Sequence, residues 1–154
     1  MSKTINAQEL PSLVGQEMEP SSWLEITQDR VNQFADATND HQFIHIDEEK
    51  AAQTPFGGTI AHGFLTLSLV SFLTAEKAHK VEGTVMGINY GSDRVRFLQP
   101  VHVGSRIRAR QVLAEAIEKK RGHWLTRTTV TIEIENQEKP AMIAEFLAII
   151  VVKQ

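Results

Sequence analysis

The sequence predicts an α+β fold in which one long central helix is wrapped by an antiparallel β-sheet. Residues 62–79 (HGFLTLSLVSFLTAEKAH) are apolar on nearly every side, as in a buried helix. Residues 124–135 (WLTRTTVTIEIE) alternate with period two, the pattern of a long half-buried strand. Short turns separate the candidate strands, which favours antiparallel neighbours. Because neither helix nor sheet can bury its apolar surface alone, the sheet should cover the helix.

The composition bounds the class of protein. A chain of 154 residues favours one domain, residues 1–154. The net charge of −3, with scattered basic residues, argues against a nucleic-acid partner. The absence of cysteine excludes disulfides, thiolate zinc sites and a cysteine nucleophile. We find no secretory signal and no apolar stretch long enough for a bilayer, so we expect a cytoplasmic protein without a membrane partner.

The first half predicts short elements. The first two dozen residues contain three Pro or Gly and predict an irregular or short-strand lead-in. Thr27 is a plausible N-cap for a helix over about 28–37, which ends at residues 38–40 (TND). Asp47 can cap a second short helix over about 48–53. Residues 54–63 (TPFGGTIAHG) predict the loop before the long helix.

The second half predicts the sheet. Residues 84–91 form a candidate strand, and 93–97 (DRVRF) alternate between apolar and basic. Further candidates are 105–114, 124–135 and 141–152, with turns at Pro100–Gly104 and at 136–139. One sheet around one helix is the hot-dog arrangement. Its outer face and edges commonly bind a second subunit, so we expect a homodimer at least.

Residues 39–47 (NDHQFIHID) contain the first candidates for chemistry. Asp40 and His45 lie between two predicted helices, where a carboxylate and an imidazole together can hold and polarise a water molecule. Imidazole titrates near neutrality and suits a general base. Burial beside Phe43 and Ile44 would strengthen both effects. The alternative is that these polar side chains cap helix ends.

A metal site is a second alternative for this region. His41, His45, Asp47 and His62 could converge in the fold. However, they do not lie on one predicted helix as a metal-binding His-x-x-x-His pair does. We therefore expect no metal.

Gly63 and Ser71 are candidates on the long helix. The first N–H groups of a helix lack intrahelical partners and carry partial positive charge, and a glycine there lets a ligand carbonyl approach closely. That is the requirement for an oxyanion hole, although a simple loop-to-helix glycine explains Gly63 equally. Ser71 follows by eight residues on roughly the same face. Its hydroxyl can form a hydrogen bond with a polar group in the cavity, or it can donate to the preceding turn of its own helix.

Three stretches together resemble the MaoC-like dehydratases, which include R-specific enoyl-CoA hydratases and the nodulation protein N-like branch. They are DHQFIHID, PFGGTIAHGFLTLSLVS and INYGSDRVRFLQPVHVGSRIRAR. The family's hydratase pattern is Asp-x-Asn-Pro-[Leu/Ile]-His. Asp40 and His45 match it in type and spacing, while Gln42 and Phe43 replace the usual Asn and Pro.

The resemblance implies a hot-dog fold, a dimer and the reversible hydration of trans-2-enoyl-CoA to (3R)-hydroxyacyl-CoA without a metal or organic cofactor. It implies that Asp40 and His45 are the catalytic pair and that Gly63 supplies the oxyanion-hole amide. Ser71 matches the family's active-site serine. His62 and Phe64, which flank Gly63, are expected with Ser71 to bind substrate. We expect Phe64 and Leu67 to line an acyl-chain tunnel.

Two other functions fit the same fold. A hot-dog thioesterase would cleave the acyl-CoA thioester with a carboxylate that activates water at the carbonyl carbon. A non-catalytic acyl-CoA-binding or dimerisation subunit would bind the ester unchanged, although the presence of both Asp40 and His45 argues against it. The sequence does not define acyl-chain length, or whether an acyl carrier protein replaces CoA.

Overall fold

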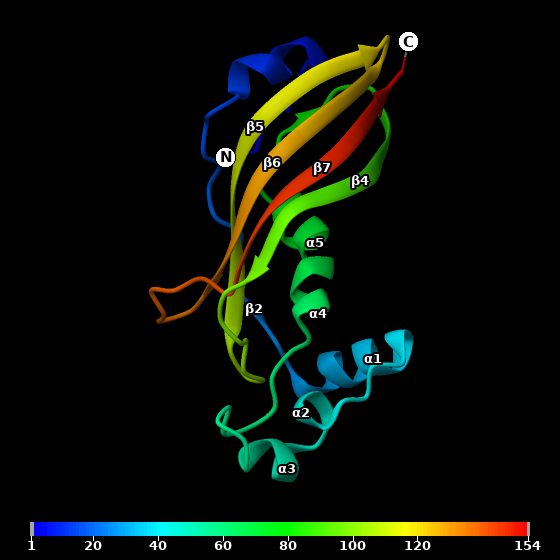
Figure 1. Ribbon diagram of the computed structural model, residues 1–154. Helices are drawn as coiled ribbons and strands as arrows, with labels where there is room; N and C mark the ends of the chain where they lie inside the picture. The colour runs from blue at the N-terminus through cyan, green and yellow to red at the C-terminus, as the bar shows by residue number, and fades with distance from the viewer. Residues whose placement is uncertain (1, 154) are drawn as a thin grey trace.

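The computed structural model describes residues 2–153, and its main feature is a five-stranded antiparallel sheet curled around a helical rod (Figure 1). The strand order is β2-β5-β6-β7-β4. The strands are β2 (Leu24–Glu25), β4 (Thr84–Phe97), β5 (Arg106–Lys120), β6 (His123–Ile134) and β7 (Met142–Val152). The rod consists of α4 (Gly63–Ser68) and α5 (Val70–Ala75). This confirms the predicted hot-dog arrangement.

Two strands, β4 and β5, are longer than the sequence patterns indicated. The candidates at 84–91 and 93–97 are one strand, β4, because register shifts after Asn89 and Asp93 absorb the break in alternation. The candidate at 105–114 continues to Lys120 in β5. The alternation in β6 is confirmed, since Trp124, Val130 and Ile132 are buried against the helix or the N-terminal segment.

The predicted helix over 62–79 is shorter and interrupted. It divides at Leu69, whose ψ of −10° departs from helical geometry, and it ends at Ala75. The hydroxyl of Ser68 donates to the Phe64 carbonyl at 2.6 Å, and that of Thr74 donates to the Val70 carbonyl at 2.7 Å. Such back-bonding bends helices, and the Ser68 bond lies next to the break at Leu69.

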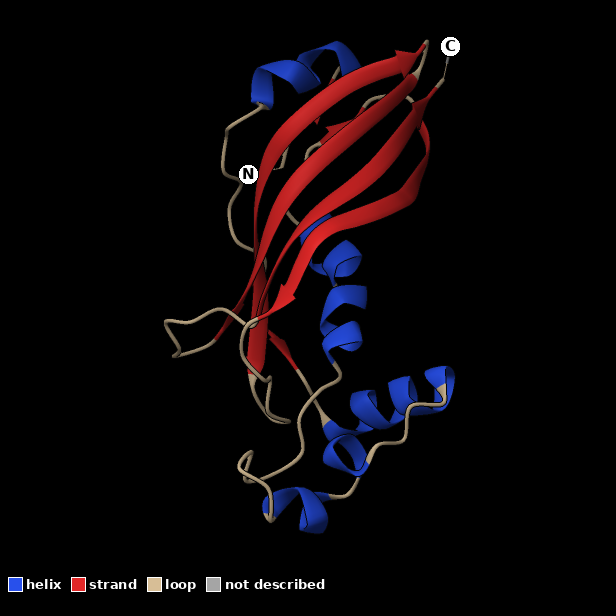
Figure 2. Ribbon diagram, viewed as in Figure 1, coloured by secondary structure: helices blue, strands red, loops and turns tan. Residues whose placement is uncertain are grey.

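Three short helices project beyond one end of the sheet (Figure 2). They are α1 (Gln28–Thr38), α2 (Phe43–Ile46) and α3 (Glu48–Ala52). The predicted caps are confirmed, because Thr27 accepts from the Arg30 amide and Asp47 from the Lys50 amide. α2 was not predicted, so His45 lies in a short helix rather than in the expected segment between two helices.

The N-terminal lead-in packs over the opposite end of the sheet. It contains β1 (Thr4–Ile5), which pairs in parallel with β3 (Lys80–Val81), and the 3₁₀-helix η1 (Ala7–Leu13). The main core lies between the rod and the sheet, and a second core forms beneath η1 around Leu10, Leu113 and Trp124. Within residues 2–153, no helix has both the length and the apolarity to span a bilayer.

Candidate active site

His45 lies in α2 with only 6% of its surface exposed. Its Nδ1 donates to the Ile60 carbonyl at 2.7 Å, which assigns the proton of the neutral ring to Nδ1. The lone pair therefore lies on Nε2. A buried imidazole held in one tautomer has the form of a general base.

The Ile60 carbonyl is itself held in place by the backbone around it. The Ile60 amide donates to the Ile44 carbonyl at 3.0 Å, and the Ala61 amide donates to the Val101 carbonyl at 2.8 Å. The segment predicted as a loop is therefore partly extended and paired with residues 101–103. This pairing fixes the orientation of His45.

Gln28 is a further positioning residue that sequence patterns did not identify. Its amide nitrogen donates to the His45 carbonyl at 2.8 Å, and its amide oxygen accepts from the Thr59 hydroxyl at 2.6 Å. It thus links the start of α1 to α2 and to the segment before Gly63. In the sequence, Gln28 follows the Thr27 cap as an ordinary first residue of a helix, and nothing in the pattern indicates its contact with His45.

The environment of His45 favours the neutral imidazole. Burial lowers the pKa of His45 below its ordinary value of 6.5, and the nearby His62 lowers it further. The hydrogen bond to Ile60 and the Asp40 carboxylate oppose this shift but do not reverse it. The His45 ring is accordingly unprotonated at neutral pH.

His62 joins the predicted catalytic residues to one another. Only 3% of its surface is exposed, its ring stacks on His45 with centroids 3.8 Å apart, and its Nε2 donates to the Asp40 main-chain carbonyl at 2.9 Å. The Asp40 side chain is 53% exposed, with Oδ2 4.0 Å from His62 Nε2. His62 therefore contacts both Asp40 and His45 from a buried position. Its buried Nδ1 has no hydrogen-bond partner within residues 2–153.

The three side chains also form the strongest candidate for a metal site among the described residues. One ligand atom each from Asp40, His45 and His62 lie within 4.8 Å of one another. However, a metal lies in the plane of each imidazole that binds it, and two rings stacked at an interplanar angle of 24° do not direct lone pairs at one ion. The other candidates lie elsewhere, since His41 pairs with Asp36 and Asp47 caps α3.

Gly63 begins α4, as predicted, and shares a hollow with His45. This His45 hollow has a volume of about 250 Å³ and is also lined by Thr66 and Phe97. A Cβ on Gly63 would lie only 3.0 Å from the Phe97 ring, so alanine here would require the ring to shift. The first amide of α4 thus lies at the same hollow as the His45 ring.

Ser71, Phe64 and Leu67 lie away from this hollow. Ser71 is exposed on α5 and donates to Asn89 at 3.5 Å rather than back to its own helix. Phe64 is 66% exposed and lies against Phe97 edge to face, while Leu67 lines a shallow groove. The residues predicted for the site therefore lie in two places in the described chain. Ser71 is about 12 Å along the rod from Gly63, at 1.5 Å per residue. The other group, at the Gly63 end, consists of Asp40, His45, His62 and Gly63.

This arrangement suits the addition or removal of water next to a carbonyl group. A separation of up to 4.8 Å between the Asp40 carboxylate and a ring nitrogen of His45 leaves room for a bridging water molecule. A carbonyl that accepts from the amides at the start of α4 would lie in the hollow that His45 lines.

Comparisons with known proteins point to the same chemistry. The family model described as "MaoC like domain" matches residues 9–136. Nodulation protein N of Rhizobium meliloti is 50% identical over 94% of this chain and 91% of its own length. The 3-hydroxyacyl-thioester dehydratase Z of Mycobacterium tuberculosis is 46% identical over 89% of this chain and 90% of its own. The R-hydratase PhaJ1 structure from Pseudomonas aeruginosa superposes with a TM-score of 0.70 and 26% identity, covering 92% of this chain and 83% of that one.

Proposed function

Because the chain belongs to the MaoC-like dehydratase family, a family of hydro-lyases, we propose that it hydrates trans-2-enoyl-CoA to (3R)-hydroxyacyl-CoA and catalyses the reverse dehydration. The observation that carries this proposal is the tautomer of His45. Its Nδ1–H is committed to Ile60, so Nε2 is a fixed, neutral acceptor next to the amides at the start of α4.

In the proposed mechanism, the thioester carbonyl accepts a hydrogen bond from the Gly63 amide. Asp40 and His45 hold one water molecule against C3, and His45 Nε2 takes a proton as the oxygen forms its bond to C3. The electron pair of the double bond moves to the carbonyl oxygen, where the Gly63 N–H stabilises the enolate. The proton is then delivered to C2, so that one water molecule is added in total.

The test is hydration of crotonyl-CoA, followed by loss of enone absorbance and by release of free thiol. The wild type should consume the enone without releasing thiol, whereas thiol release would indicate a thioesterase. Asp40→Asn and His45→Gln should each lower kcat by about 10²–10⁴, the usual contribution of acid–base groups. Circular dichroism should show both variants folded. Near-normal hydration by either variant would remove it from the proposed catalytic pair.

We also propose that the protein is a homodimer in which a second copy covers β4. This edge strand is exposed along nearly its whole length, with Val85 at 60% and Tyr90 at 63%, and Phe72 on the rod is 65% exposed. Apolar side chains on an open strand edge mark an interaction surface. Tyr90→Lys should shift the mass measured by light scattering toward the monomer, and a monomeric wild type would contradict the proposal.

A further inference from the structure

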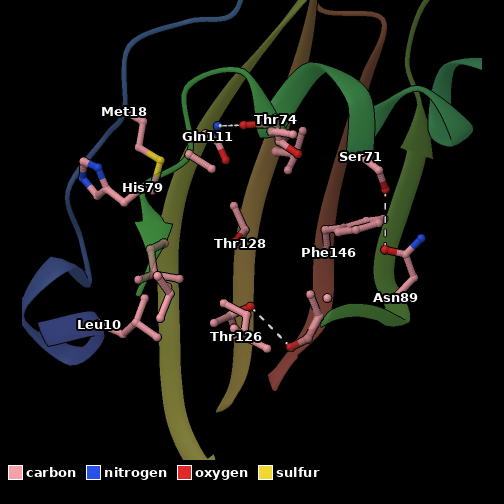
Figure 3. Close-up of a pocket in the computed structure, with 18 of the residues that line it drawn as sticks. Leu10, Met18, Ser71, Thr74, His79, Asn89, Gln111, Thr126, Thr128 and Phe146 are labelled. Atoms are coloured by element: carbon pink, nitrogen blue, oxygen red, sulfur yellow. Dashed lines mark hydrogen bonds between the residues drawn. The ribbon is translucent and has the colours of Figure 1, made fainter. Parts of the chain in front are cut away.

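Thr66 is the one hydroxyl residue of the rod whose side chain forms no hydrogen bond within residues 2–153. α4 and α5 contain four such residues, which are Thr66, Ser68, Ser71 and Thr74. Ser68 and Thr74 donate back to their own helices, and Ser71 donates to Asn89 at a separate cavity of about 470 Å³ (Figure 3). Only 3% of Thr66 is exposed. A buried hydroxyl without a partner lowers the stability of a fold, which is typical of functional sites rather than of packing.

The usual acceptor for the Thr66 hydroxyl is already occupied. A threonine hydroxyl in a helix commonly donates to the carbonyl four residues earlier, which here belongs to His62. The His62 carbonyl accepts the Leu65 amide at 3.0 Å and the Thr66 amide at 3.3 Å. Because a carbonyl oxygen has two lone pairs, these two amides use its capacity. The Thr66 hydroxyl therefore keeps its proton available for another acceptor.

The Thr66 side chain lies on the wall of the His45 hollow, one helical turn after Gly63. Residues three apart share a face of a helix, and each Cα–Cβ bond tilts toward the helix N-terminus. The side chain of Thr66 is thus directed toward the first turn of α4, where the Gly63 amide lies. In the described chain no hydrogen bond joins the hydroxyl to His45, so it and the imidazole Nε2 are both available to a ligand in the hollow.

Gln99 is the remaining polar side chain on the wall of this hollow and is the alternative donor. It is half-buried, and its amide also forms no hydrogen bond within residues 2–153. A glutamine side chain has several rotatable bonds that ligand binding would have to order. The β-branched side chain of Thr66 is restricted at χ1 by its helix. Since an effective oxyanion donor is held in place before the reaction, the comparison favours Thr66.

We propose that the Thr66 hydroxyl is the second hydrogen-bond donor to the thioester carbonyl, beside the Gly63 amide. The proposal rests on the proposed function, because it takes the carbonyl to lie at the start of α4. As water adds at C3, the electron pair of the double bond moves to the carbonyl oxygen, and the hydroxyl donates to the enolate that forms. Two donors from different directions also fix the rotation of the thioester, which holds C3 against the water between Asp40 and His45.

The experiment replaces Thr66 with valine, which keeps the β-branched shape and removes the hydroxyl. Because no protein group loses a partner, Thr66→Val should have a melting midpoint at or above that of wild type. With crotonyl-CoA its kcat should fall by about 10²–10³, the usual contribution of one oxyanion donor. Thr66→Ser keeps a hydroxyl that rotates more freely at χ1 and should stay within about tenfold of wild type. Thr74→Val is the matched control and should be fully active, because the Thr74 hydroxyl bonds within α5 and does not line the hollow.

Two further measurements distinguish a donor to the carbonyl from a group that acts through His45. The acid limb of kcat/KM should keep its midpoint in Thr66→Val, because the hydroxyl does not bond to the imidazole. Butyryl-CoA with carbon-13 at its carbonyl has no double bond to hydrate and serves as an unreactive probe. Its bound C=O stretch in difference infrared spectra should lie at higher frequency in Thr66→Val than in wild type, because one hydrogen bond to that oxygen is lost.

A kcat of Thr66→Val within about threefold of wild type would overturn the proposal and leave the proposed function intact. A large loss in Gln99→Met with normal Thr66→Val would assign the second donor to Gln99 instead. A shifted acid limb, or a melting midpoint well below that of wild type, would show that the hydroxyl acts on His45 or on the fold. If the wild type hydrates no ester, the proposed function fails, and the infrared comparison still decides. An unchanged C=O stretch in Thr66→Val, or no binding of butyryl-CoA by wild type, would refute the donor.

Discussion

Replacing Gly63 with alanine tests the amide at the start of α4 with the smallest possible change. The added Cβ would lie 3.0 Å from Cδ2 and Cγ of Phe97 and 3.1 Å from Cδ1. Carbon atoms are attracted at about 3.5–4.0 Å, so the ring must retreat by roughly half an ångström. The methyl group would also occupy space where a thioester carbonyl approaches the Gly63 N–H.

The cost to folding should be small and the cost to catalysis large. Forcing a methyl group into a packed site costs about 1–3 kcal/mol, and we expect the lower end because Phe97 is 47% exposed and can turn outward. Alanine recovers up to about 1 kcal/mol through its higher helix propensity. One oxyanion donor contributes about 10²–10³ in rate, so kcat should fall by that factor while the thermal midpoint changes by a few degrees at most.

The assay is crotonyl-CoA hydration beside a thermal melt. Gly58→Ala is the control, because its Cβ would meet nothing within 4 Å in the loop that leads to Gly63, and it should be fully active. If Gly63→Ala kept kcat within about threefold of wild type, the amide could not be the oxyanion donor. A large fall in the melting midpoint with equal loss of soluble protein would show that the effect is on folding instead.

The remaining predictions concern the groups that hold His45. Because burial lowers its pKa, the acid limb of kcat/KM should have its midpoint below pH 6.5; a midpoint at or above that value would contradict this assignment. Between the folded-state pKa and 6.5 the unfolded chain binds the proton and the folded chain does not, so the free energy of unfolding should fall as pH decreases through this window, and His45→Gln should flatten that dependence in urea titrations. His62→Phe keeps a stacked ring but loses the hydrogen bond to Asp40, and we expect kcat to fall about tenfold with KM little changed; equal kcat would make that bond merely structural. Gln28→Leu leaves the Thr59 hydroxyl and the His45 carbonyl unpaired, which should cost about 1–3 kcal/mol of unfolding free energy, and an unchanged urea midpoint would contradict this.

The parts of the fold that could be predicted from sequence are those with sustained periodicity. The alternation over 124–135 located β6 and its buried face, and the apolar run after Gly63 located the rod. α2 was not predictable in this way because four residues are too few to show a helical period. For Ser71, a spacing of eight residues indicated the same face of the helix as Gly63 but not the distance between them, which is about 12 Å along the axis and places Ser71 at another cavity.

The candidate site was predictable in its residue types but not in its support. Asp40, His45 and Gly63 are identified by a motif. By contrast, Gln28 and the carbonyl of Ile60 act through contacts 17 and 15 residues away from His45 along the chain. Such contacts are set by tertiary pairing and leave no local pattern. His62 shows the same limit. Its place next to Gly63 predicted substrate contact, but its burial and its hydrogen bond to the Asp40 carbonyl depend on tertiary pairing and could not be predicted.

The chemistry of His45 therefore depends on backbone pairing some distance from it. Burying an imidazole is tolerated only when its N–H finds a partner, and here the partner is a carbonyl rather than a carboxylate. A carboxylate would stabilise the imidazolium and raise the pKa, whereas a neutral carbonyl fixes the tautomer and leaves burial to keep the ring unprotonated. That carbonyl stays in position because the Ile60 and Ala61 amides pair with α2 and with residue 101. These backbone hydrogen bonds thus fix the orientation and tautomer of the His45 ring, while burial keeps it neutral.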